Sequence, residues 1–110
     1  MTITELEALT QERRLVTAIP GPISQQMQAR KDTAIARGVG TTLPVYVVAA
    51  AGGVLADVDG NQLLDLSMGF GAMLVGHLNP VVVEHVNRAL TETGTLFVTP
   101  SPQATEMAER

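Results

Sequence analysis

Residues 54–66 read VLADVDGNQLLDL, and this stretch predicts a β-hairpin. Residues 54–56 and 62–66 are rich in aliphatic side chains and are typical of two strands. The five residues between them form the clearest turn in the chain, because glycine tolerates a positive φ angle and Asp and Asn side chains bond back to their own backbone. We therefore expect an antiparallel hairpin with a positive φ angle at Gly60.

A further strand is expected on the N-terminal side of this hairpin. Residues 45–48 are β-branched or aromatic, and Gly52-Gly53 supply a turn before residue 54. On the other side, residues 67–77 contain three glycines in eleven positions. We expect this second segment to form an irregular, tightly packed loop.

Two helices are predicted before the sheet. The first covers residues 2–16. Pro20-Gly21-Pro22 prevent it from extending further, because proline cannot continue the hydrogen-bond ladder of a helix. The second covers residues 24–36, with Ser24 near its cap and Gly38 as its stop. The apolar positions that indicate the first helix are Ile3, Leu6, Leu9 and Leu15.

Two more helices are predicted after the glycine-rich loop. Asn79-Pro80 and Ser101-Pro102 each combine a capping side chain with proline at the first helical position. The first of these helices should end at Gly94. The second is expected to be still helical at Arg110, which favours a truncated chain. The elements together predict an α+β segment.

Composition excludes several classes of function. The 110 residues suffice for one modest domain, and 7 Lys and Arg against 11 Asp and Glu give a formal charge of −4. The basic residues neither cluster nor alternate with aromatic ones, so no nucleic-acid or membrane-surface partner is expected. The apolar run at residues 43–56 is too short and too often interrupted to cross a membrane. Because the chain has no cysteine, we expect a cytoplasmic protein without disulfides.

Two patterns resemble cofactor or metal sites but lack necessary residues. Gly69-Phe70-Gly71 follows a strand, as in a dinucleotide-binding loop, but Leu74 stands where the third glycine belongs. His77 and His85 are eight residues apart, and the chain has no third His and no Cys to complete a metal site. We interpret both histidines as structural, with His77 bonded to backbone groups at a helix entrance and His85 on the outer or flank face of that helix.

Carboxylates and lysine offer no catalytic chemistry either. Asp57 and Asp59 are two carboxylates in a five-residue turn, where they favour turn geometry over a bound cation. Lys31 is the single lysine, and it lies beside Arg30 and Asp32 on a polar helix, whereas a Schiff-base lysine must be desolvated. We expect no catalytic residue, no cofactor ligand and no metal ligand within this chain.

Several separated motifs nevertheless occur in an order typical of one family. The motifs are Ile19-Pro20-Gly21-Pro22, Arg37-Gly38-Val39-Gly40, Leu43-Pro44-Val45-Tyr46, Asp57-Val58-Asp59-Gly60-Asn61, Leu64-Asp65, Met68-Gly69-Phe70-Gly71-Ala72-Met73-Leu74, Gly76-His77, Pro80 and Gly94-Thr95-Leu96-Phe97. In these motifs the chain resembles the N-terminal region of class III pyridoxal-phosphate-dependent aminotransferases, over nearly all of its own length and about the first quarter of theirs. The N-terminal part up to Leu66 is most similar to members that act on 4-aminobutyrate. From Ser67 onward the sequence looks more like the glutamate-1-semialdehyde aminomutase branch.

This resemblance implies an α/β fold of fold type I, in which residues 1–40 form an N-terminal helical arm and residues 41–110 part of the small domain. Such enzymes work as homodimers with pyridoxal 5'-phosphate at the subunit interface. In the family's pattern the phosphate-binding motif, the Asp on the pyridine nitrogen and the Schiff-base lysine lie beyond residue 110. The resemblance places Phe70 against the substrate, with Gly69 and Gly71 keeping its loop close to the cofactor.

Two hypotheses of different class follow. In the first, the chain is the N-terminal part of a transaminase that moves an amino group from 4-aminobutyrate or a similar ω-amine to a 2-oxo acid, with an aminomutase-like reaction as the alternative enzyme. In the second, the 110-residue chain is a non-catalytic fragment that at most dimerises, because it lacks the Schiff-base lysine. Phe70 also has a plain interpretation, since a lone Phe usually belongs to a core.

Overall fold

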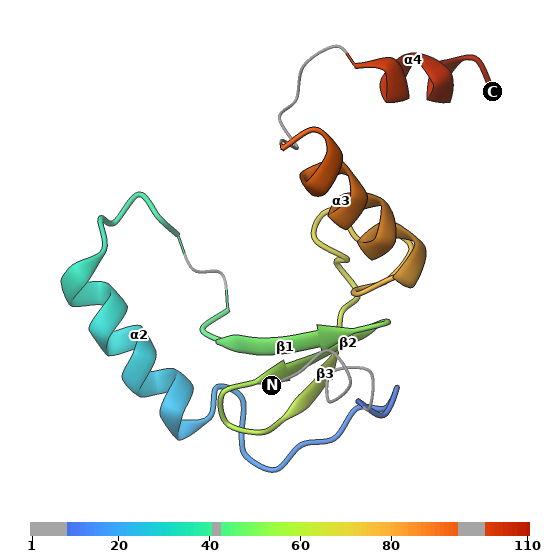
Figure 1. Cartoon of the computed structure of the whole chain (residues 1–110). Helices are drawn as coiled ribbons and strands as arrows, with labels where there is room; N and C mark the ends of the chain where they lie inside the picture. Colours follow the sequence, from blue (N-terminus) through green and yellow to red (C-terminus); the bar gives the residue numbers. More distant parts are fainter. Residues whose placement is uncertain (1–8, 41–42, 95–100) are drawn as a thin grey trace. The chain divides into compact units, whose positions relative to one another are not determined.

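The computed structural model describes residues 9–40, 43–94 and 101–110, and the chain divides into two compact units, Met1–Asn79 and Pro80–Arg110. Among the described residues, three helices and a three-stranded antiparallel sheet confirm the predicted α+β segment (Figure 1). The first unit contains α2 (Pro22–Ala34), β1 (Val47–Ala51), β2 (Val54–Asp57) and β3 (Gln62–Leu64), and the second contains α3 (Pro80–Glu92) and α4 (Pro102–Ala108).

The predicted hairpin is the centre of the first unit. β2 lies between β1 and β3, and the register pairs Val54 with Leu64 and Ala51 with Val54. Val54 is almost fully buried, and Ala49 and Ala51 on β1 are the other buried apolar residues of the described chain. The core of this segment is therefore small.

Both outer strands differ from their predicted bounds. β1 begins at Val47 rather than at residue 45, because the N–H of Val45 donates to the nearby carbonyl of Leu43 over 2.8 Å instead of joining the sheet. β3 ends at Leu64 rather than at residue 66. The next residue, Asp65, directs its side chain to the loop that follows.

The turn between β2 and β3 has the predicted chemistry. Gly60 has a φ angle of 85°, and its N–H donates to the Asp57 carbonyl over 3.1 Å. The Oδ1 atom of Asp57 accepts the N–H groups of Asp59 at 3.0 Å and Asn61 at 2.8 Å. The carboxylate of Asp57 thus fixes the turn, as in an Asx turn. No cluster of three or more side chains suited to a metal ion occurs among the described residues.

The predicted helix over residues 2–16 is wrong in its second half. Residues 1–8 lie outside the described residues, and residues 9–19 contain no helix. Arg14 instead exchanges two backbone hydrogen bonds with Gln62, of 3.0 and 2.7 Å. Pairing with the hairpin satisfies backbone groups that a helix would have paired internally, so tertiary contacts override a weak helical period.

Asn61 ties the same N-terminal segment to the turn. Its side chain is fully buried, and its Oδ1 accepts the N–H groups of Val16 at 2.8 Å and Thr17 at 2.9 Å. Its Nδ2 donates to the Thr17 hydroxyl at 2.8 Å and to Asp57 Oδ2 at 2.9 Å. A buried amide with all four of these bonds fixes the path of residues 16–17.

Helix α2 receives its cap from the hairpin. It begins at Pro22 rather than at the predicted Ser24, and its N-cap residue, Gly21, has no side chain to offer. The carboxylate of Asp59 accepts the N–H groups of Ile23 at 2.6 Å and Ser24 at 2.9 Å. A negative charge at this end also complements the helix dipole.

The helices of the second unit begin at their predicted prolines, Pro80 and Pro102. α3 begins at Pro80 and ends at Glu92, shortly before Gly94, which has a φ angle of 69°. In α4 the Ser101 hydroxyl accepts the N–H of Ala104 at 3.2 Å. This helix ends at Ala108, so the expectation that it is still helical at Arg110 is wrong. Within the described ranges, no helix has the length and apolar character needed to span a membrane.

Candidate functional site

The glycine-rich loop that carries Phe70 is attached to the sheet at both ends. At its start the N–H of Asp65 donates to the carbonyl of Gly53 over 2.9 Å. At its end the backbone of His77 exchanges two hydrogen bonds of 2.9 Å with Gly52. Both glycines lie between β1 and β2. The loop is therefore closed at its base by the sheet.

The middle of the loop is a short left-handed turn. Four consecutive residues have positive φ angles: Met68 at 46°, Gly69 at 60°, Phe70 at 56° and Gly71 at 92°. The Met68 carbonyl accepts the N–H groups of Gly71 at 3.1 Å and Met73 at 2.9 Å. For residues other than glycine this conformation costs about 1–2 kcal/mol each. The turn is therefore strained at Met68 and Phe70.

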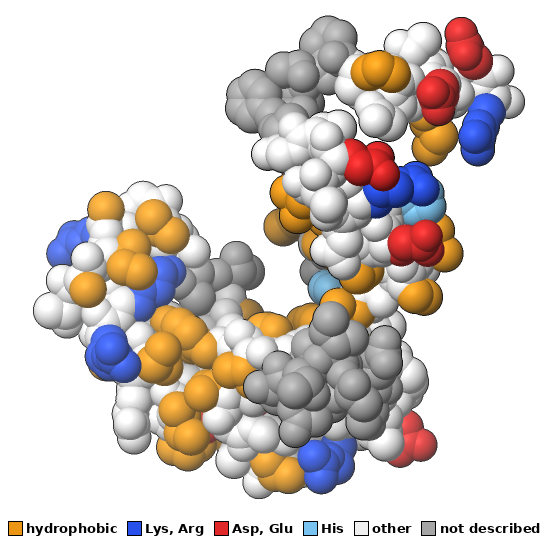
Figure 2. Space-filling view, viewed as in Figure 1, with side chains coloured by type: hydrophobic (Ala, Val, Ile, Leu, Met, Phe, Trp, Pro, Cys, Tyr) orange, Lys and Arg blue, Asp and Glu red, His pale blue; other side chains and the backbone are white. Residues whose placement is uncertain are grey.

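Phe70 is fully exposed at the tip of this turn. Leu66 and Leu74, with 90% and 80% of their surface accessible, are exposed on either side of it. The expectation of a tightly packed loop is therefore wrong, since residues 69–75 are exposed throughout. Figure 2 shows that hydrophobic side chains lie on the surface of this unit in several other places as well. Phe70 is not part of the core formed by the described residues.

The two glycines beside Phe70 are required by backbone conformation. A Cβ atom on Gly71 would meet nothing within 4 Å, and one on Gly69 would make ordinary contacts with Met73 and Ala72. Their positive φ angles, rather than close packing inside this segment, therefore account for glycine at these positions.

Asp65 binds the loop with both carboxylate oxygens, a role that sequence reasoning missed. Oδ1 accepts the N–H of Ser67 at 3.1 Å, the Ser67 hydroxyl at 3.0 Å and the N–H of Met68 at 2.8 Å. Oδ2 lies 2.8 Å from Nε2 of His77. The contact with His77 is the main cause that lowers the pKa of Asp65; burial opposes it, and the bonds from Met68 and Ser67 add to it.

The two histidines differ in their surroundings. The His77 side chain contacts Asp65 rather than the backbone groups of a helix entrance, so that detail of its predicted role is wrong. His85 lies exposed on α3, as predicted, and its Nδ1 is 2.8 Å from the carbonyl oxygen of Val81 in the preceding turn.

An Asp at a strand end followed by Ser two residues later is a signal that could have indicated the bonds from Asp65 to the loop.

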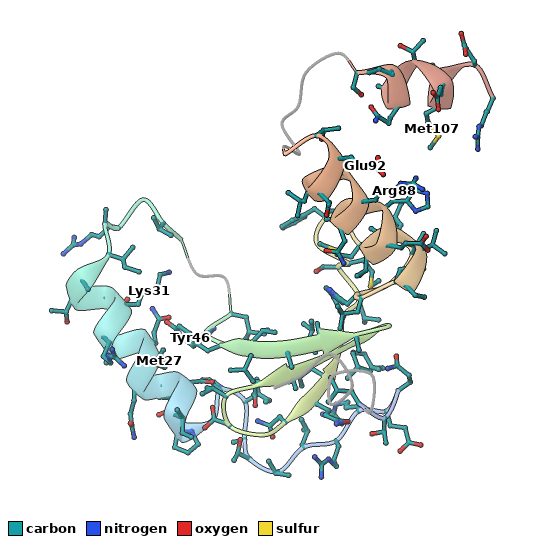
Figure 3. The ribbon with its side chains drawn as sticks, viewed as in Figure 1. Met27, Lys31, Tyr46, Arg88, Glu92 and Met107 are labelled. Atoms are coloured by element: carbon teal, nitrogen blue, oxygen red, sulfur yellow. The ribbon has the colours of Figure 1, made fainter. Side chains whose placement is uncertain are left out.

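Lys31 does not offer the site that an aldehyde cofactor needs. Its Nζ donates to the carbonyl of Val39 over 2.9 Å. Lys31 lies at an open pocket of about 380 Å³ whose lining includes other polar and charged side chains. Figure 3 shows Lys31 on the helix that Tyr46 approaches, and the Tyr46 hydroxyl donates to Gln28 of the same helix at 3.0 Å. A Schiff-base lysine is buried and desolvated. The described residues therefore do not form a site that fits pyridoxal phosphate.

The sequence is similar to proteins of known families. The family described as "Aminotransferase class-III" matches residues 34–109. The chain is 46% identical over 107 residues to a 4-aminobutyrate aminotransferase of Mycobacterium tuberculosis (strain ATCC 25618 / H37Rv), covering 96% of this chain and 24% of that protein. It is 46% identical over 94 residues to a 4-aminobutyrate aminotransferase of Mycobacterium leprae, covering 84% and 21%.

A second group of relatives has a different name. The chain is 38% identical over 97 residues to a glutamate-1-semialdehyde 2,1-aminomutase of Symbiobacterium thermophilum, covering 88% of this chain and 21% of that protein. In all of these comparisons the chain spans about a quarter or less of the length of the curated relative.

Proposed function

Because the chain belongs to the class-III aminotransferase family, we propose that it is the N-terminal part of a pyridoxal-phosphate-dependent transaminase. The amino donor is 4-aminobutyrate or a similar ω-amine, and the acceptor is a 2-oxo acid. The identity of 46% to proteins named 4-aminobutyrate aminotransferase, against 38% to an aminomutase, supports this donor. Residues 1–40 act as an arm and residues 41–110 as part of the small domain of a cytoplasmic homodimer.

In this proposal, Phe70 forms part of the substrate site. Its ring stands exposed on a strained turn, and strain of this kind persists where function requires a fixed geometry. An aromatic ring beside the methylene chain of an ω-amine excludes water from it and favours an unbranched substrate. Gly69 and Gly71 contribute by allowing the backbone conformation that presents the ring.

Residues outside 1–110 supply the cofactor site in this proposal. The only lysine of the chain, Lys31, is bonded to a backbone carbonyl at an open pocket. The same observation favours a second candidate, that a polypeptide of these 110 residues alone is non-catalytic and at most dimerises. A third candidate, an aminomutase that acts on glutamate-1-semialdehyde, is supported by the relatives with that name and by the sequence from Ser67 onward.

The test is an assay of the protein produced from its own gene, loaded with pyridoxal phosphate. We expect transfer of the amino group from 4-aminobutyrate to 2-oxoglutarate to be faster than conversion of glutamate-1-semialdehyde. The reverse order would favour the aminomutase. The 110-residue chain, assayed in parallel, should neither catalyse transfer nor show the visible absorbance of bound cofactor; a cofactor spectrum from it would exclude the fragment interpretation.

A further inference from the structure

One carboxylate connects the two ends of the loop that carries Phe70. Asp65 holds the start of the loop through Ser67 and Met68, and it holds the end of the loop through His77. These contacts leave little of either side chain accessible, 8% for Asp65 and 18% for His77. The pair therefore lies at the base of the loop, and Phe70 lies at its exposed tip.

We propose that Asp65 and His77 are positioning residues that hold the left-handed turn at residues 68–71 and so set the place of the Phe70 ring. This inference rests on the proposed function, because it gives the ring a substrate to contact. Neither residue touches substrate; both act through the loop.

The strain in the turn is the reason a positioning pair is needed. Met68 is the first of the four residues of the turn with a positive φ angle, and its N–H makes the shortest of the three bonds to Asp65 Oδ1. A strained conformation persists only where its surroundings fix it at several points. Within the loop the backbone bonds from Met73 to Met68 and from Gly76 to Met73 add support, and the Asp65 side chain bonds directly to both the turn and His77.

The hydrogen-bond chemistry assigns a direction to the pair. An ionised Asp65 can only accept hydrogen bonds. The Nε2 atom of His77 therefore carries a hydrogen and donates the hydrogen bond to Oδ2 of Asp65. A glutamine at position 77 would retain a donor close to the place of Nε2, whereas a leucine would fill similar space without one. These two substitutions therefore separate the hydrogen bond from simple packing.

The first test uses kinetics of the enzyme produced from its own gene. His77→Leu is expected to lower kcat/KM for 4-aminobutyrate about tenfold, which is the scale of a misplaced apolar contact. His77→Gln is expected to keep most of the wild-type kcat/KM. Because the effect passes through Phe70, His77→Leu should cost little in a Phe70→Ala background. His85→Leu, which changes an exposed histidine on α3, is the control and should leave kcat/KM unchanged.

The second test does not depend on activity. Amide hydrogen exchange should be accelerated in residues 66–76 of His77→Leu and unchanged in β2 and β3, while His77→Gln exchanges like wild type. The proposal would be overturned by faster exchange throughout the sheet or by unchanged exchange in the loop. It would also be overturned if the losses of kcat/KM from His77→Leu and Phe70→Ala simply multiply in the double variant. If the wild type lacks transaminase activity, the proposed function fails, and hydrogen exchange still decides whether the pair holds the loop.

Discussion

The carboxylate of Asp59 accepts a hydrogen bond of 2.9 Å from the backbone N–H of Ser24, so the hairpin turn caps a helix that begins far earlier in the sequence. The same turn holds residues 16 and 17 through Asn61. Three neighbouring polar residues, Asp57, Asp59 and Asn61, therefore fix the turn itself, helix α2 and the segment before that helix. The hairpin organises the first unit mainly by hydrogen bonds, because its apolar core is small.

The close approach of Asp59 to Gly21 leads to the first prediction. A Cβ atom at position 21 would collide with the Asp59 carboxylate. Gly21→Ala should therefore lower the free energy of unfolding by about 1–3 kcal/mol, the usual cost of overpacking. Thermal unfolding of the enzyme produced from its own gene, followed by circular dichroism, measures this. Gly38→Ala is the control, because a Cβ there meets nothing within 4 Å; equal melting temperatures for the two variants would contradict the cap.

The turn glycine gives the second prediction. Gly60 has a φ angle of 85°, which a β-branched residue adopts only with strain. Gly60→Val should lower the free energy of unfolding by about 1–3 kcal/mol. Gly53→Val provides the comparison, since Gly53 has no positive φ angle and open space around it. If a denaturant titration of the enzyme produced from its own gene finds Gly60→Val as stable as wild type, this turn conformation is not required.

Part of the fold was predictable because its causes are local. The positive φ angle at Gly60 and the helix starts at Pro80 and Pro102 follow from residues adjacent in sequence. The helix predicted over residues 2–16 failed because contacts with Gln62, distant in the sequence, decide the conformation of residues 9–16. A helical period reports only on a residue's near neighbours.

The candidate site was predictable to a smaller extent. The Gly69-Phe70-Gly71 pattern indicated an unusual loop, but not that Phe70 itself has a positive φ angle or is fully exposed. The contact between Asp65 and His77 joins residues twelve positions apart. No sequence pattern specifies such a contact until the strand pairing that brings both residues to the same end of the sheet is known.

The pKa values of Asp59 and Asp65 give a prediction about acid stability. Burial raises the pKa of Asp59, but hydrogen bonds from Ser24 and Ile23 outweigh it, and the net pKa lies below the ordinary 3.8. The pKa of Asp65 is lowered as well, mainly by His77. A lowered pKa in the folded state means that the unfolded state binds more protons just below pH 3.8, so stability falls as the pH drops through this region.

This acid dependence can be measured directly. In the enzyme produced from its own gene, melting temperatures between about pH 2 and 6 should fall steeply toward the acid end for the wild type, and Asp65→Asn should show a shallower dependence. An identical slope for both proteins would contradict the assignment to Asp65. Asp32→Asn is a suitable control, because Asp32 is an exposed carboxylate on α2 and away from both contacts.

The exposed apolar residues predict how the 110-residue chain behaves alone. Val48 on β1 and Val81 on α3 are both more than half exposed, as are Leu66 and Leu74 in the loop. An isolated chain with this surface should associate and unfold with low cooperativity. Size-exclusion chromatography and a thermal melt test this together. A monodisperse monomer with a sharp two-state transition would contradict it.

The role of Phe70 in substrate binding is the central claim, and one substitution tests it most directly. In the enzyme produced from its own gene, Phe70→Ala should lower kcat/KM for 4-aminobutyrate by the equivalent of about 1–3 kcal/mol, with the melting temperature and cofactor binding nearly unchanged. If Phe70 instead packs in a core of the assembled protein, the substitution should destabilise the fold by about 3–5 kcal/mol, with activity falling only in proportion to the folded fraction. That second result would contradict a substrate-binding role for Phe70.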